Sequence, residues 1–147
     1  MEKLKFDSGV RAYDLGCGVL RFNPSDPNLF GRFLDAAEEI RDIEKELLEK
    51  ANAAENADDG KLTVQLLVEA DRKMKALLQK VFGQVNDFDK ILGGVNLLAV
   101  AGNGERVITN LFAALEPVLV DGAQSCAAGT AAQALSKAKK RREQTER

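Results

Sequence analysis

The spacing of hydrophobic residues changes at the segment Asn23-Pro24-Ser25-Asp26-Pro27. Before this segment, apolar residues alternate with polar ones, as Leu4 and Phe6 do around Lys5. Alternation is the period of a strand with one buried face. After the segment, apolar residues recur every three or four positions, which is the period of a helix. The chain therefore predicts a small β head followed by a helical body.

The head contains three short strand-like stretches within residues 3–22, separated by turn-forming segments at residues 7–9 and 14–18. Glycine and aspartate in these segments suit the backbone conformations of tight turns. The pattern predicts an antiparallel β-meander over residues 3–22. Because so small a sheet is marginal alone, its apolar face should pack against a helix.

Two long helices should follow and form a hairpin. Asp26 is a suitable N-cap and Pro27 a suitable first helical residue. The first helix is expected over about residues 27–56, and the second, ended by Gly83, over residues 61–82. Each carries one apolar stripe, formed by Leu29, Phe33, Ala36, Ile40, Ile43 and Leu47 in the first and by Thr63, Leu67, Ala70, Met74, Leu77 and Val81 in the second. Stripes of matching period favour antiparallel packing.

The second half of the chain is less regular. Residues 87–92 predict a helical turn, and residues 95–100 fit either a buried strand or a packed loop. A third helix is expected over residues 105–120, kinked or restarted at Pro117. Residues 123–147 form an Ala-rich and then basic tail, either helical or disordered. The predicted fold is α+β, mainly α, with one domain over residues 1–122.

Charge is unevenly distributed along the chain. The formal net charge is -2, but residues 135–147 carry six basic and two acidic side chains, which leaves -6 on the rest. Nucleic-acid-binding domains usually spread basic charge over one face, so we expect no nucleic-acid partner. The short basic tail fits a solubilising helix end better than a contact with an anionic surface.

The composition argues against catalysis. The chain has no histidine, which removes Ser-His-Asp and Cys-His mechanisms and leaves few groups that titrate near neutral pH. We therefore expect no enzyme, no catalytic residue and no cofactor.

Three local features could suggest a site, and each has a simpler explanation. Asp87 and Asp89 lack further ligands at calcium-loop spacing, and Asp87 suits a helix N-cap. The turn Gly102-Asn103-Gly104 lacks the third glycine and the βαβ setting of a nucleotide site. Cys17 and Cys126 have no second ligand at metal spacing. No metal site and no disulfide are expected.

Neither a signal peptide nor a membrane span is apparent. Charged residues interrupt the first thirty positions, and no apolar run approaches the roughly twenty residues that a span needs. We expect no membrane partner and a soluble protein of the cytoplasm.

Several segments resemble a family of small proteins from the tail-gene clusters of phages and prophages of Gram-positive bacteria. The similar segments run in order over roughly residues 4–120 and comprise Leu4-Lys5-Phe6, Gly18-Val19-Leu20-Arg21-Phe22, Asn23-Pro24-Ser25-Asp26-Pro27-Asn28-Leu29-Phe30-Gly31-Arg32-Phe33, Val81-Phe82-Gly83, Asp87 and Phe112-Ala113-Ala114-Leu115-Glu116-Pro117. The resemblance implies a non-catalytic tail assembly chaperone. Its partners would be the tape-measure protein, whose helices it binds, and the tail-tube protein, whose subunits it helps to recruit.

An apolar groove flanked by charges would suit that role, because it excludes water locally while the free protein stays soluble. The stripes are also suitable core surfaces, and heptad-like spacing permits a homo-oligomer without requiring one. The hypothesis is that part of this surface exchanges internal contacts for partner helices, through Phe30, Phe33, Ile40, Leu67 and Met74. Two other functions remain open: a structural tail or head-completion component of the virion, and a small phage-encoded inhibitor of a host protein.

Overall fold

The computed structural model describes residues 1–53 and 60–145. Two strands and four helices follow one another in the order β1 (Arg11–Asp14), β2 (Val19–Phe22), α1 (Pro27–Ala53), α2 (Gly60–Phe82), α3 (Phe88–Ile91) and α4 (Val107–Thr145). The fold is α+β and mainly α, as the sequence predicts.

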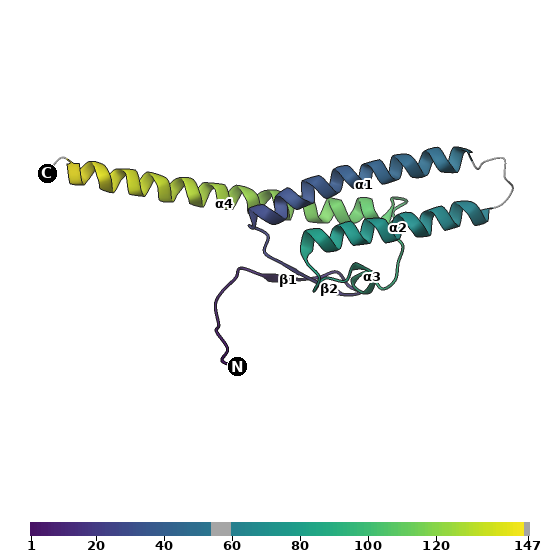
Figure 1. Cartoon of the computed structure of the whole chain (residues 1–147), viewed down its shortest axis with the longest axis horizontal. Helices are drawn as coiled ribbons and strands as arrows, with labels where there is room; N and C mark the ends of the chain where they lie inside the picture. Colours follow the sequence, from purple (N-terminus) through teal and green to yellow (C-terminus); the bar gives the residue numbers. More distant parts are fainter. Residues whose placement is uncertain (54–59, 146–147) are drawn as a thin grey trace.

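Helices α1 and α2 lie antiparallel, and the first half of α4 packs against them (Figure 1). The hairpin begins as predicted, because the Asp26 carboxylate accepts a hydrogen bond of 2.9 Å from the N–H of Asn28. Gly83 ends α2 with a φ of 100°, which glycine adopts without strain. The expected extension of the first helix to residue 56 and the turn before residue 60 lie outside the described residues.

The β head has two strands, so the predicted three-stranded meander is wrong within this chain. The strands pair antiparallel, with Arg11 opposite Phe22 and Asp14 opposite Val19. Residues 4–6 form no strand. A hydrogen bond of 2.9 Å from the Asn23 side-chain amide to the Ser8 carbonyl fixes the base of residues 1–10. Figure 1 shows this arm leaving the body instead of folding back onto β1.

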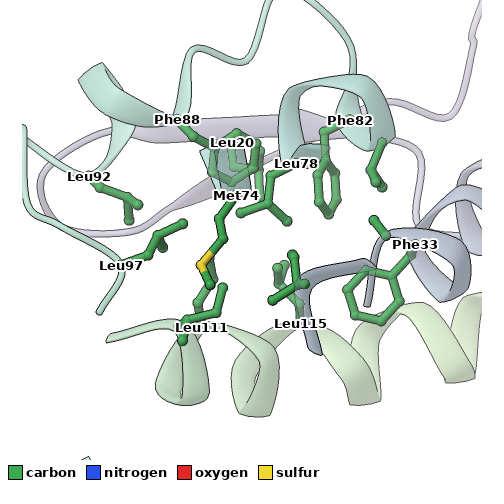
Figure 2. Close-up of a cluster of buried hydrophobic side chains, with 14 of the residues drawn as sticks. Leu20, Phe33, Met74, Leu78, Phe82, Phe88, Leu92, Leu97, Leu111 and Leu115 are labelled. Atoms are coloured by element: carbon green, nitrogen blue, oxygen red, sulfur yellow. The ribbon is translucent and has the colours of Figure 1, made fainter. Parts of the chain in front are cut away.

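One core joins the hairpin, the strands, α3 and the first half of α4. Met74 and Leu78 of α2 and Leu20 of β2 are fully buried. Figure 2 shows Met74 reaching toward Leu111 of α4, while Phe88 of α3 lies beside Leu20. The helix that the small sheet needs is therefore supplied chiefly by α2.

Asn86 attaches the β head to the body. Its side chain accepts a hydrogen bond of 2.9 Å from the Arg21 N–H and donates one of 2.7 Å to the Arg21 carbonyl. It also donates to the Phe82 carbonyl at the end of α2. Because the Asn86 side chain pairs with β2 as a neighbouring strand would, the outer edge of β2 is occupied.

Helix α4 is longer than the third helix predicted over residues 105–120. It begins at Val107, passes through Pro117 without interruption and ends at Thr145. The proline breaks no tertiary contact because it is exposed, and Leu115 and Leu119 on either side are buried. Packing thus outweighs the local loss of one backbone hydrogen bond. Residues 123–145 take the helical alternative left open for the tail.

Segments between α2 and α4 follow the predictions closely. The Asp87 carboxylate caps α3 by accepting hydrogen bonds from the N–H groups of Asp89 and Lys90. Residues 95–100 form a packed loop in which Leu97 and Leu98 are buried. The loop closes through one antiparallel bridge between Val100 and Arg106. Of the two alternatives for this segment, the loop is correct.

Candidate functional site

A groove runs between α1 and the first half of α4. Its floor is apolar, and Phe33 of α1 meets Phe112 of α4 edge to face, with ring centroids 5.4 Å apart. Leu34 lies beside the floor with 53% of its surface exposed. The groove is lined by Phe33, Leu34, Ala37, Ile40, Arg41, Glu44, Ile108, Thr109, Phe112, Ala113 and Glu116.

Charged side chains border this groove on both helices. Arg41 and Glu44 stand on the α1 side, and Glu116 stands on the α4 side. Both signs of charge are therefore present around an apolar floor. An amphipathic helix has complementary features, because its apolar face needs burial and its polar flanks need partners.

The five residues predicted to bind a partner divide into two groups. Phe33, Ile40 and Met74 are core residues, with 5%, 1% and 0% of their surfaces exposed. Phe30 and Leu67 are half-buried and pack against the same core. Phe33 and Ile40 also line the groove floor. Met74 lies between α2 and α4, so direct contact between it and a partner would require these helices to separate.

Several large apolar side chains outside the two stripes are exposed. On the hairpin, Leu48 of α1 and Val64 of α2 are 61% and 56% exposed. On the arm, Leu4 and Phe6 are 91% and 82% exposed. These residues therefore contribute little to the core of one chain.

An ion-pair network lies between α2 and α3, with Asp71 and Lys75 buried and Asp89 exposed. The Lys75 ammonium is 3.0 Å from the Asp71 carboxylate and 2.7 Å from the Asp89 carboxylate. Asp71 also accepts a hydrogen bond of 2.8 Å from the Leu97 N–H. Burial lowers the pKa of Lys75, but hydrogen bonds and charge attraction from Asp89 and Asp71 outweigh it, and the net change is upward. The network holds helix and loop together as charged groups.

Chemistry at this network is restricted by its contacts. The hydrogen bond from Lys75 and its positive charge lower the pKa of Asp89, so both partners remain ionised near neutral pH. Asp87 and Asp89 therefore act as a helix cap and an ion-pair partner. Among the residues that the structure describes, no three Asp, Glu or Cys side chains are grouped to hold a metal ion.

Sequence reasoning missed Lys75, Asp71 and Asn86 as buried polar residues. The sequence contained a signal for Asp71 and Lys75. Each comes directly after a residue of the apolar stripe, Ala70 and Met74, and the two charged residues lie four positions apart. Charges so near a buried stripe either reach water or pair with one another. No comparable pattern marks Asn86, whose partners are backbone groups that only the fold brings near.

No family model, curated protein or solved structure matches this chain. No helix within residues 1–53 and 60–145 is long and apolar enough to cross a bilayer.

Proposed function

We propose that this chain is a non-catalytic phage tail assembly chaperone that works in the host cytoplasm. It binds helices of the tape-measure protein and helps to recruit tail-tube subunits. The groove between α1 and α4 is the observation that carries this proposal. The resemblance over residues 4–120 supports it independently, because the implied partner is a long protein rich in amphipathic helices.

The groove suits one helical partner segment. Along α1 its lining extends from Phe33 to Glu44, and eleven steps of 1.5 Å give a length of about 17 Å. Along α4 it extends from Ile108 to Glu116. A partner helix of about three turns would lay its apolar face on the floor and its charged flanks against the two rims. Helix-in-groove recognition works in this way.

The exposed groove residues, not the core residues, should decide the affinity. Leu34 and Ala113 are exposed lining residues on opposite sides of the groove. Phe33 and Ile40 support the floor from below, and replacing either with aspartate would unfold the body before it tested binding. Leu34→Asp combined with Ala113→Arg therefore probes the groove while the core is retained.

Co-expression of the chain with the tape-measure protein, followed by affinity capture, tests the proposal. The double variant should recover at least tenfold less tape-measure protein, since charges would face an apolar partner surface. Val64→Asp is the matched control, because Val64 is equally exposed but belongs to α2 and does not line the groove. Equal recovery with the double variant, shown to be folded by circular dichroism, would rule out the groove.

Mass spectrometry of mature particles distinguishes the proposed role from a structural one. An assembly chaperone is released before the virion is complete, so the chain should be absent from purified particles. A stoichiometric presence would instead identify a tail or head-completion component and overturn the proposal.

A further inference from the structure

The N-terminal arm has the pattern of a strand without a strand's partner. All side chains of residues 1–10 are exposed, including the large apolar side chains of Leu4, Phe6 and Val10. Leu4 and Phe6 alternate with Lys3 and Lys5, so an extended arm has one apolar and one basic face. Such a segment is suited to pairing with the edge of a sheet.

β1 offers an open edge for this pairing. The register places Ala12 opposite Arg21, and Arg21 directs its backbone groups away from β1 toward Asn86. In an antiparallel pair, directly opposed residues either both bond across the pair or both point outward. The backbone N–H and carbonyl of Ala12 therefore point away from β2, along the opposite edge of the sheet. That edge can accept another strand.

A hollow lies beside this edge, between the sheet and α4. Its lining is mixed. Apolar surface comes from Val10 at the start of the arm, Tyr13 of β1, Pro24 and Val118 of α4, and the remaining lining residues are Asp7, Gly9, Arg11, Asn23, Ser25, Asp121, Gly122 and Ser125. Tyr13 stacks on Phe22 at a centroid distance of 4.8 Å, which places it on the core-facing side of the sheet. A strand added to β1 would direct every second side chain from this side into the hollow.

The charges on the other side of the sheet also match. Asp14 is exposed and alternates with Tyr13, so it lies on the outer face, where it also accepts a hydrogen bond from the Gly16 N–H. The basic Arg21 on this face belongs to β2, one strand further from the open edge. An added strand with its apolar residues over the hollow would present Lys3 and Lys5 on this outer face. Opposite charges on neighbouring strands stabilise the pairing.

The arm of the same chain is directed away from this edge. The Asn23 side chain holds the Ser8 carbonyl at 2.9 Å, and the Asp7 carboxylate accepts a hydrogen bond of 2.8 Å from the Gly9 N–H. These contacts fix the start of the arm in a course that leaves the body (Figure 1). In a second molecule the same contacts also direct the arm outward, where its residues 3–6 can reach the open edge of the first molecule.

We propose that two copies of this chain exchange arms, with residues 3–6 of each copy adding a strand to β1 of the other. Leu4 and Phe6 fill the partner's hollow, and Lys3 and Lys5 face the partner's Asp14. Because the exchange is reciprocal, it closes a twofold dimer. The tape-measure protein takes no part in this contact. A failed dimer test would therefore leave the proposed chaperone function untouched, and the reverse also holds.

Light scattering after size-exclusion chromatography, over a dilution series of the full chain, tests the dimer. Wild type should show twice the mass of one chain and dissociate on dilution. The double variant Leu4→Ser, Phe6→Ser should be monomeric throughout, and it keeps its fold because both residues lie outside the core. Leu135→Ser is the control, since Leu135 is 72% exposed on the far part of α4 and should leave the dimer intact.

A second variant tests the strand pairing itself. Ala12→Pro removes the N–H that points away from β2 and leaves the hairpin's own hydrogen bonds in place, as proline on an edge strand does. This variant should also be monomeric. Hydrogen exchange should show protection of arm amides in wild type that disappears on dilution. A monomeric wild type, dimeric variants, or arm protection that is independent of concentration would overturn the proposal.

Discussion

Gly122 marks the closest approach between α4 and the segment that leads into α1. A Cβ atom built at this position would lie 1.8 Å from the Pro24 carbonyl oxygen and 3.0 Å from the Ser25 nitrogen. Both are backbone atoms, so no side chain can rotate away. The substitution Gly122→Ala would force α4 and the Pro24 segment apart by roughly 1.5 Å to reach ordinary van der Waals contact.

Two effects of opposite sign decide the change in stability. Alanine favours the helix over glycine by about 1 kcal/mol. Overpacking at a rigid contact costs typically about 1–3 kcal/mol, and this contact is at the severe end because backbone meets backbone. We expect a net loss of about 1–2 kcal/mol in the free energy of unfolding, because the displacement also disturbs the neighbouring packing of Leu119.

Urea unfolding followed by circular dichroism measures this loss. Gly129→Ala is the matched control, because Gly129 lies in the same helix and a Cβ there meets no atom within 4 Å. The control should leave the unfolding midpoint of the body unchanged and slightly raise the helical signal. If Gly122→Ala unfolded at the same urea concentration as wild type, the close approach of the two backbones would be refuted.

Asn86→Leu should cost about 3 kcal/mol or more, because three backbone groups lose their buried partner; chemical denaturation measures this, with the exposed Asn103→Leu as control. Arg32→Met should cost about 1–2 kcal/mol, since the guanidinium donates two hydrogen bonds to the Val81 carbonyl at the end of α2, and unchanged exchange of the last α2 amides would contradict it. Burial lowers the pKa of the Lys75 ammonium, but hydrogen bonds and charge attraction from its carboxylate partners raise it by a larger amount. The folded-state pKa therefore lies above the usual 10.5. Their stabilisation is complete below pH 10.5 and is lost as the pH rises through the folded-state pKa, so Lys75→Met should lose less stability than wild type in this alkaline range.

The helices were predictable because their signals are local. Asp26 and Pro27 start α1 as expected, and Gly83 ends α2. The prediction of a third strand was wrong because strand pairing depends on segments that are distant in the sequence. Residues 4–6 have the correct alternation, but pairing needs an edge within reach, and the Asn23 contact with Ser8 directs the arm elsewhere. Alternation shows which face of a segment is apolar and does not show which strand covers it.

The candidate site was only partly predictable. The helical period marks Phe33 and Ile40 as members of an apolar stripe, but the same period cannot separate a groove floor from a core. The groove also needs Phe112 and Ala113, which come from a helix whose packing against α1 depends on the whole fold. Similarly, nothing near Pro117 in the sequence shows that Leu115 and Leu119 are buried strongly enough to hold α4 intact.

The far half of α4 has a consequence for how the molecule responds to heat. From Ala127 to Thr145 every side chain is exposed, so this stretch is helical by its own propensity and by contacts within one helix. Warming should shorten it gradually from its free end, well before the body unfolds in a single cooperative step. A calorimeter would register mainly the later step, whereas far-ultraviolet circular dichroism would record a sloping baseline that precedes it.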